Sequence, residues 1–527
     1  MTVLVVAPDD AAAPTGPAPG RAGRALLLTA VAACAACGLV YELVLLTLST
    51  SLTGGGITQT SLIVAGYVAA LGLGALLAKP FLHRAATTFV AVEIALGVAG
   101  GLSAVTLYVG YSFYGTSTVV LIVATLLLGG LVGAEVPLLM TLLQTGRRDR
   151  DAQSAGRVLA NLNAADYAGA VLGGLAWPFL LLPLMGQVRG AAVTGLVNLL
   201  AAGLVAGLLL RRQMSRRAQL LSAVALLGAV ALLSTLLVRA ADIEVTARQR
   251  LYADPVVSAQ RSDYQEVVLT ERRGDLRLYL DGDLQFSSLD EYRYTEALVH
   301  PVLARDPERV LVLGGGDGLA ARELLRAPSV REVVQVELDP AVLALATTRL
   351  SELNGGALQD PRVELVVADA FRWLREHTGP DFDAVVVDLP DADTVALARL
   401  YSTEFYGLVG AALAPGGLVV VQSGSPYSTP TAFWRTVSTV ASAGLAGTPY
   451  HVHVPSFGDW GFVLAAAEQQ PPELRLSPDA PSLRFLDDAV LAAAAVFPRD
   501  RQQQLLPPTT LDRPRVVADL RRGYVGQ

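Results

Sequence analysis

The chain has 527 residues, 52% of them hydrophobic and 17% charged, and a formal net charge of −7. This length exceeds one ordinary domain, the apolar content excludes wholesale disorder, and the two cysteines exclude a disulfide scaffold. Residues 1–238 carry 13 Lys and Arg against 8 Asp and Glu, whereas residues 239–527 carry 27 against 39. The sequence therefore predicts an almost uncharged part followed by an acidic one, which disfavours nucleic acid as a ligand.

Residues 1–23 are rich in Ala and Pro and predict a disordered tail. Residues 24–238 predict an all-α, multi-pass domain in the lipid bilayer of the cell membrane. A stretch of about 20 apolar residues spans a bilayer as a helix. About seven such windows occur, namely 25–50, 57–82, 86–110, 117–144, 158–184, 190–210 and 218–238.

The basic residues between these windows alternate from side to side. One side holds Arg21, Arg24, Lys79, Arg84, Arg147, Arg148, Arg150, Arg157, Arg211, Arg212, Arg216 and Arg217. The other side holds only Arg189 before the last window. The positive-inside rule places the first set and the N-terminus in the cytoplasm, so seven crossings would leave residue 239 outside. Because the chemistry below needs a cytosolic metabolite, we favour a cytoplasmic second domain. One window then does not cross or an eighth crossing exists; the alternative is an external domain.

Four acids lie in or beside the apolar windows: Glu42, Glu93, Glu135 and Asp166. Acids at membrane depth often line a polar path, which suggests a pathway for a cation or polyamine. Alternatively, these side chains are neutral, lie at the interface or form hydrogen bonds between helices.

The second part changes pattern along its length. Residues 239–255 predict a linker, and residues 256–300 predict antiparallel hairpins followed by a short helix. Within residues 301–470, strands alternate with helices, which predicts an α/β Rossmann-like, doubly wound parallel sheet. Residues 471–527 predict a peripheral segment. The strands are expected at 310–313, 333–337, 363–367, 384–388 and 417–422.

Ligands of such sheets bind at the carboxyl ends of the strands, where Asp317, Glu337, Asp369 and Asp388 all fall. Glu337 ends the second strand and is suited to ribose hydroxyls, and Asp369 is suited to an adenine amino group. The glycine turn 314–318 lacks both the P-loop and the dinucleotide spacing. The pattern favours an S-adenosyl ligand, unless Glu337 and Asp369 merely cap helices.

Asp317 distinguishes between two such ligands. Its carboxylate would repel the carboxylate of S-adenosylmethionine and attract the bare ammonium of a decarboxylated analogue, by up to about 4 kcal/mol at 4 Å. Asp388 begins a segment with two further acids, Asp391 and Asp393, which would attract a diamine. A carboxylate there can take the proton that the attacking amine must lose. The alternative is a solvated acidic loop.

Six motifs in register resemble those of spermidine synthases, over roughly 260–470. The membrane half resembles that of multi-pass bacterial members of the family. The motifs are Tyr-Gln at 264–265, Leu-Asp-Gly-Asp-Leu-Gln at 280–285, Asp-Glu-Tyr-Arg-Tyr-Thr-Glu at 290–296, Gly-Gly-Gly-Asp-Gly at 314–318, Val-Glu-Leu-Asp at 336–339 and Asp-Ala at 369–370.

The resemblance implies transfer of an aminopropyl group from decarboxylated S-adenosylmethionine, a co-substrate, to putrescine. Spermidine and methylthioadenosine would be the products, with no metal and no other cofactor. It also suggests a homodimer formed through the hairpin region. Asp388 would accept the proton, Asp317 would hold the aminopropyl ammonium and Asp391 would hold the amine. The adenosyl part would contact Gln265, Glu337, Asp369 and Ala370, and the amine channel would be lined by Gln285, Tyr294 and Thr295.

Two departures from the family pattern leave the acceptor amine open. Thr295 stands where the family usually has His, and residues 388–392 read Asp-Leu-Pro-Asp-Ala. Two other functions remain as alternatives: a polyamine transporter or sensor whose second domain binds without turnover, and a class I methyltransferase that uses S-adenosylmethionine. His451 and His453 share one face of an expected strand without a third ligand of matching spacing, so we expect no zinc site.

Overall fold

A computed structural model describes residues 21–53, 57–114, 118–144 and 152–525. The chain divides into two compact units, one ending at Leu251 and one beginning at Tyr252. We call them the helical unit and the α/β unit. Most of the predicted tail, together with Arg147, Arg148 and Arg150, lies outside the described residues.

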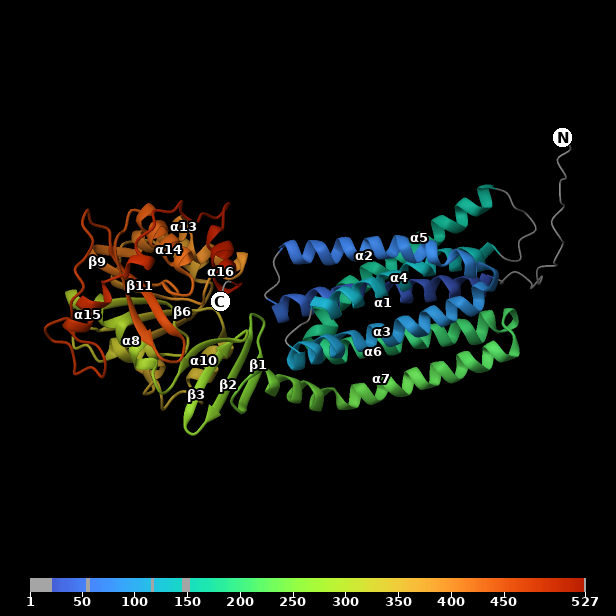
Figure 1. The fold of residues 1–527 in the computed structure, drawn as a ribbon, viewed down its shortest axis with the longest axis horizontal. Helices are drawn as coiled ribbons and strands as arrows, with labels where there is room; N and C mark the ends of the chain where they lie inside the picture. The colour runs from blue at the N-terminus through green and yellow to red at the C-terminus, as the bar shows by residue number, and fades with distance from the viewer. Residues whose placement is uncertain (1–20, 54–56, 115–117, 145–151, 526–527) are drawn as a thin grey trace. The chain divides into compact units, whose positions relative to one another are not determined.

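The helical unit is a bundle of long apolar helices that lie alongside one another (Figure 1). A π-helical turn, Trp177–Leu181, joins two of them, and Gly186 (φ 72°, ψ −175°) interrupts the second. The helices are α1 (Arg21–Thr53), α2 (Ile57–Leu77), α3 (Ala85–Tyr114), α4 (Thr118–Gln144), α5 (Ala152–Ala176), α6 (Leu182–Val205) and α7 (Arg216–Leu251).

Six helical stretches of the described chain are long and apolar enough to cross a membrane. One of them, Leu159–Gln213, has 55 residues and would measure about 80 Å, far more than the ~30 Å of the hydrocarbon layer. Gly186 divides this stretch into the two predicted windows 158–184 and 190–210. Large apolar side chains point outward, as in Leu62 of α2 (69% exposed) and Leu221 of α7 (70% exposed). A water-soluble bundle would bury such side chains.

Glycines set the closest helix contacts of the bundle. A Cβ added at Gly74 would collide with the backbone of Gly130, and one added at Gly169 would collide with the backbone of Ala32. These positions join α2 to α4 and α5 to α1. Small residues thus let the backbones of these helices approach each other closely.

Helix α7 continues to Leu251, through most of the stretch 239–255 that the sequence predicts as a linker. Residues 239–251 contain neither Gly nor Pro, so nothing in them stops the helix. Arg239 and Asp242 also form an i, i+3 ion pair on its surface. Pro255 precedes the first strand.

The α/β unit begins with a small antiparallel sheet, as expected. Its strands are paired in the order β1 (Val256–Arg261), β2 (Glu266–Arg272), β3 (Asp275–Leu280) and β4 (Asp283–Ser287). Arg273 with Gly274, and Asp281 with Gly282, take positive φ values in its two tight turns. This conformation suits the right-handed twist of a hairpin.

The larger sheet has seven strands in the order β10-β11-β9-β8-β5-β6-β7. The five predicted strands are parallel, while β10 and β11 form an added antiparallel hairpin, so the sheet is mixed. The strands are β5 (Arg309–Gly314), β6 (Glu332–Glu337), β7 (Val363–Val367), β8 (Phe382–Asp388), β9 (Leu413–Gln422), β10 (Ala446–Val454) and β11 (Gly458–Ala466).

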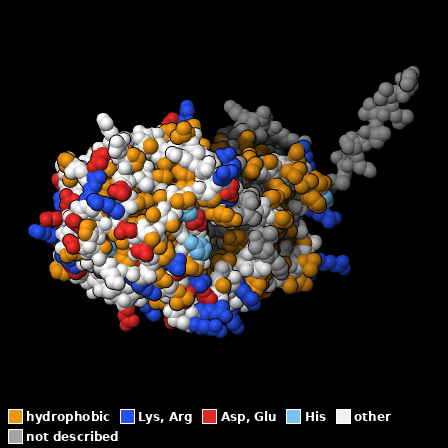
Figure 2. All heavy atoms as spheres, turned by 60° about the vertical axis from the view of Figure 1, so that its left-hand side comes forward, with side chains coloured by type: hydrophobic (Ala, Val, Ile, Leu, Met, Phe, Trp, Pro, Cys, Tyr) orange, Lys and Arg blue, Asp and Glu red, His pale blue; other side chains and the backbone are white. Residues whose placement is uncertain are grey.

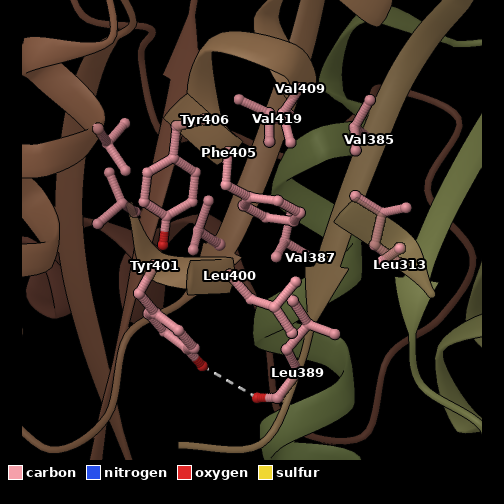
Figure 3. Close-up of a cluster of buried hydrophobic side chains, with 14 of the residues drawn as sticks. Leu313, Val385, Val387, Leu389, Leu400, Tyr401, Phe405, Tyr406, Val409 and Val419 are labelled. Carbon is pink, nitrogen blue, oxygen red and sulfur yellow. Dashed lines mark hydrogen bonds between the residues drawn. The ribbon is translucent and has the colours of Figure 1, made fainter. Parts of the chain in front are cut away.

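Helices flank the sheet and bury both of its faces. On one face, Phe405 and Tyr406 pack over the β8 and β9 residues Val387 and Val419 (Figure 3). The outer surface of the unit mixes charged, polar and apolar side chains (Figure 2). The main helices are α8 (Glu291–Val299), α9 (Leu319–Leu325), α10 (Pro340–Ala346), α11 (Ala370–Glu376), α12 (Val395–Ala398), α13 (Thr403–Ala412), α14 (Pro430–Ser442), α15 (Asp488–Ala494) and α16 (Arg515–Val525).

Candidate functional site

The candidate site lies where the parallel strands β8, β5 and β6 end side by side. Gly314, the last residue of β5, is in register with Asp388, the last residue of β8. The Gly315 amide donates a hydrogen bond of 2.9 Å to the Asp388 carbonyl oxygen. Glu337 ends the strand on the other side of β5. The topology therefore brings together acids that are 51 residues apart in the sequence.

The turn after β5 requires glycine for two separate reasons. Gly314 has φ 85°, and a Cβ there would collide with the Asp388 carbonyl oxygen. At Gly316 an added Cβ would lie 2.7 Å from Glu337 Oε2. The turn thus lies between the two carboxylates, and its missing side chains leave backbone open to a ligand.

Asp388 is held by Tyr294 of α8. The Tyr294 hydroxyl donates a hydrogen bond of 2.6 Å to Asp388 Oδ1. The Tyr294 ring packs against Phe457 and Phe462, with ring centroids 5.9 and 5.3 Å away. Burial raises the pKa of Asp388 to about 6, although the Tyr294 hydrogen bond lowers it. A pKa raised toward neutrality suits a carboxylate that takes up a proton during a reaction.

Asp317, in the turn after β5, shares this environment. Burial and then the charge of Asp388 raise the pKa of Asp317 to about 7, against a 2.9 Å hydrogen bond from the Leu319 amide to Asp317 Oδ1. The partly buried carboxylates of Asp317 and Asp388 thus repel each other at the strand ends. A ligand cation between them would relieve that repulsion, as a bare ammonium would.

The end of β6 is tied to the small sheet through Asp339, which is fully buried. Its Oδ2 accepts hydrogen bonds from Gln265 Nε2 (3.0 Å) and Ser262 Oγ (2.7 Å). The Asp339 amide in turn donates to Glu337 Oε1 (2.9 Å). Gln265 and Glu337 are therefore brought together, as expected. Burial is the main cause that raises the pKa of Glu337.

Asp369 lies at a strand end and also caps a helix. Its side chain accepts the Arg372 amide and so caps α11, which begins at the buried residue Ala370. Its other carboxylate oxygen pairs with Arg399. Asp369 therefore lies at the expected strand end, with both carboxylate oxygens engaged.

A second group of acids links the loop after β8 to the turn between β3 and β4. We call it the acidic rim, and it consists of Asp281, Asp283, Asp391 and Asp393. Burial and the nearby charges of Asp393, Asp391 and Asp281 raise the pKa of Asp283 to about 6. Gln285 lies beside it and donates from Nε2 to the Asp283 carbonyl oxygen (3.1 Å). The expected residues Asp391 and Gln285 thus border one acidic area, which attracts cations.

Thr295 is not brought to these carboxylates. Its side chain is 2% exposed, and its hydroxyl donates to the Glu291 carbonyl oxygen (2.9 Å) and to Glu291 Oε2 (3.1 Å). Glu291 in turn pairs with Arg322 of α9. One helical turn separates Thr295 from Glu291, so the helix directs its hydroxyl into this buried network. A role for Thr295 in the amine channel stays a prediction.

The sequence did not predict a network of hydrogen bonds around Gln422, at the end of β9. Gln422 Nε2 donates to Tyr401 Oη (2.6 Å) and to Asp391 Oδ1 (3.4 Å), and Trp460 Nε1 donates to Gln422 Oε1 (3.2 Å). Tyr401 also donates to the Leu389 carbonyl oxygen at 3.1 Å (Figure 3). The one available signal was that Gln422 is a polar residue at a strand end. This hydrogen-bond network holds the loop that carries Asp391 in position.

The remaining expectations concern metals and the C-terminal segment. His451 Nδ1 lies 2.7 Å from Asp459 Oδ1, and the described residues contain no group of three metal-binding side chains. Arg521 of α16 reaches the acidic rim, because its Nη2 lies 3.4 Å from the Asp393 carbonyl oxygen. The segment after residue 471 therefore contributes to the surroundings of the site.

Residues 291–477 match the spermine/spermidine synthase domain. A protein of Mycobacterium tuberculosis named polyamine aminopropyltransferase is 62% identical over 95% of this chain and 97% of its own. One of the same name from Corynebacterium efficiens is 58% identical over 96% and 97%. A solved spermidine synthase in complex with the transition state analogue AdoDATO covers 47% of this chain and 86% of its own, at 26% identity and a TM-score of 0.44.

Proposed function

The chain belongs to the spermine/spermidine synthase family, and we propose that its α/β unit transfers the aminopropyl group of decarboxylated S-adenosylmethionine to putrescine. The products are spermidine and methylthioadenosine. The chain is thus an enzyme, a transferase of polyamine biosynthesis. The positively charged sulfur of the co-substrate already makes methylthioadenosine a good leaving group, so the proposed step uses no metal.

In the transfer step, the unprotonated amine nitrogen of putrescine attacks the aminopropyl carbon bonded to sulfur. A C–N bond forms, the C–S bond breaks, and its electron pair neutralises the sulfonium to leave methylthioadenosine. The proton lost by the attacking nitrogen passes to Asp388, whose carboxylate is held by Tyr294. Asp317 binds the ammonium of the aminopropyl group and so directs the carbon toward the amine.

The other expected residues are assigned to the two ends of the substrates. Glu337 binds the ribose hydroxyls, with its orientation supported by Asp339 and Gln265. Asp369 and Ala370 lie beside the adenine. Asp391 and Gln285, together with the acidic rim, attract the distal ammonium of the diamine. Asp283 belongs to this set although it was not expected from the sequence.

One observation carries this proposal: Asp317 and Asp388 repel each other beside a glycine turn at the strand ends. The test is calorimetry of the full chain with decarboxylated S-adenosylmethionine and with S-adenosylmethionine, followed by product analysis with putrescine. We expect the decarboxylated ligand to bind more tightly and methylthioadenosine to be released with spermidine. Preference for the carboxylated ligand would support a methyltransferase instead, and binding without release would support a sensor.

The location of the α/β unit is a separate part of the proposal. Basic residues gather between α2 and α3 and between α6 and α7, at the end of the bundle where α1 begins (Figure 1). The last helix, α7, ends at the opposite end. We propose that the helical unit crosses the cell membrane and that α7 leads into the cytoplasm, where the sulfonium substrate is available. This orientation departs from the positive-inside rule.

A green fluorescent protein fused after Gln527 tests the orientation, because it becomes fluorescent only in the cytoplasm. We expect fluorescence at Gln527, and activity of alkaline phosphatase inserted between Gln213 and Arg216. Active phosphatase after Gln527 would place the α/β unit outside and contradict this part of the proposal, without bearing on the reaction.

We also propose a homodimer that forms through the small sheet. Strands β1 and β4 are its edges, and an edge strand offers unpaired backbone groups to another chain. Mass photometry of the chain in lipid nanodiscs should then show particles heavier than empty nanodiscs by the mass of two protomers. A single-protomer mass would contradict the dimer.

A further inference from the structure

The helical unit contains a buried polar cluster that the aminopropyl transfer does not use. Glu93 of α3 and Asn198 of α6 are fully buried, and Glu135 of α4 is 5% exposed. Tyr41 of α1 is also fully buried. Four helices thus contribute polar side chains to the interior of an apolar bundle, where an unpaired polar group is costly.

Close contact between α3 and α6 sets the geometry of this cluster. A Cβ added at Gly195 would lie 2.5 Å from the Gly97 carbonyl oxygen, so the two backbones touch there. One turn away, Asn198 Nδ2 donates to the Glu93 carbonyl oxygen (2.9 Å) and to Glu93 Oε2 (3.1 Å). The amide donors of Asn198 are therefore used within the protein.

The oxygen atoms that remain are unsatisfied. Glu93 Oε1, Glu135 Oε1, Asn198 Oδ1 and the Tyr41 hydroxyl are buried and have no hydrogen-bond partner among the described residues. Three of these four atoms can only accept hydrogen bonds when the carboxyls are ionised. The cluster therefore needs donors, and several of them at once.

The charge of the cluster is also unbalanced. Glu93 of α3 and Glu135 of α4 are both buried acids, and each keeps a carboxyl oxygen without a hydrogen-bond partner among the described residues. Across the described helices, neither Glu93 nor Glu135 forms an ion pair with Lys, Arg or His. A ligand that fits this cluster carries positive charge.

We propose that Glu93, Glu135 and Asn198 form an intramembrane binding site for a protonated aliphatic amine. A primary ammonium group has three N–H donors, and Glu93, Glu135 and Asn198 each offer one buried acceptor oxygen that has no partner among the described residues. Two carboxylates suit a diamine better than a monoamine. A metal fits less well, because no three metal-binding side chains of the described chain are grouped. The site lies wholly within the helical unit and is distinct from the strand-end carboxylates.

The test measures binding of radiolabelled putrescine to the full chain in lipid nanodiscs by equilibrium dialysis. Excess AdoDATO fills the α/β site, and its binding is measured separately, so failure of the proposed reaction is recognised independently. We expect saturable putrescine binding to persist under AdoDATO. The isosteric variants Glu93→Gln and Glu135→Gln should each weaken this binding about tenfold or more, because a charge-assisted hydrogen bond is lost.

Matched controls change buried hydroxyls on the same two helices. Ser103 and Thr125 bond only to carbonyl oxygens of their own helices, at 2.7 and 2.8 Å. Ser103→Ala and Thr125→Val should therefore leave putrescine binding unchanged, and all four variants should retain methylthioadenosine release. No binding under AdoDATO, equal loss in the control variants, or displacement by sodium at a lower concentration than by putrescine would each overturn the proposal.

Discussion

The two units place carboxylates in opposite settings. In the α/β unit, acids stand at the ends of strands, and each has a donor at hand: Tyr294 for Asp388, a backbone amide for Asp317 and another for Glu337. In the helical unit, Glu93 and Glu135 stand within helices and retain oxygens without a partner.

This difference shows how backbone geometry governs the cost of a charge. A strand end leaves free amides and turns that can meet a carboxylate, whereas a helix interior has already paired its amides. Helical carboxylates must therefore find partners on other helices or on a ligand. The α/β unit supplies donors to its acids, and the helical unit leaves oxygens of Glu93 and Glu135 without a partner among the described residues.

The largest expected effect on the α/β side comes from Asp388→Asn. An amide cannot accept the proton of the attacking amine, so turnover should fall about 100- to 10,000-fold. Binding of decarboxylated S-adenosylmethionine should stay within a few fold. The measurement is methylthioadenosine release, with Asp381→Asn as the control. Asp381 precedes the same strand at its other end, so nearly full activity is expected there. A near-normal rate for Asp388→Asn would reassign the base.

A smaller effect is expected for Asp317→Ala. Loss of one charge-assisted hydrogen bond should weaken decarboxylated S-adenosylmethionine about ten- to hundredfold. Methylthioadenosine lacks the ammonium, so its affinity should change little. Calorimetry with both ligands makes the comparison. Equal losses would show that the aspartate only supports the turn.

Tyr294→Phe should shift the pH profile of kcat/KM more than it lowers the maximal rate. In the parent chain, kcat/KM should decline as pH falls through about 7 and about 6, where Asp317 and Asp388 become protonated. The Tyr294 hydrogen bond favours the ionised form of Asp388, so its removal raises the pKa of that carboxyl. The acid limb should therefore shift to higher pH, with a loss of about tenfold or less at pH 8.

An unchanged acid limb in Tyr294→Phe would mean that the hydroxyl does not tune Asp388. The control is Tyr427→Phe in the same unit. The Tyr427 side chain is 62% exposed, so its substitution should leave the profile unchanged.

The smallest effect on catalysis is expected for Gly195→Ala, which tests whether the units are independent. A methyl group would push α3 and α6 apart and destabilise the helical unit by about 1–3 kcal/mol. Methylthioadenosine release at low temperature should be unchanged. Thermal unfolding in detergent measures the first effect, with Gly228→Ala as the control, because open space surrounds Gly228. Parallel loss of both properties would show that the units depend on each other.

Several parts of this molecule could be predicted because the signal is local. Strand-helix alternation and polar residues at strand ends predicted the parallel sheet and the position of Asp388. Helix α7 runs through most of the predicted linker, because charged residues without Gly or Pro can extend a helix. The hairpin of β10 and β11 turned the parallel sheet into a mixed one. Such an addition depends on pairing with β9, which no local pattern specifies.

By itself the sequence determined which segments avoid water and which residues stand at strand ends. Hydropathy and the spacing of apolar residues are properties of neighbouring residues in the chain. Only the tertiary structure decided what each acid meets. Tyr294 reaches Asp388 across 94 residues, and Asn198 reaches Glu93 across 105. A carboxylate's pKa and its readiness for a ligand follow from such distant partners and from burial, and neither exists until the chain has folded.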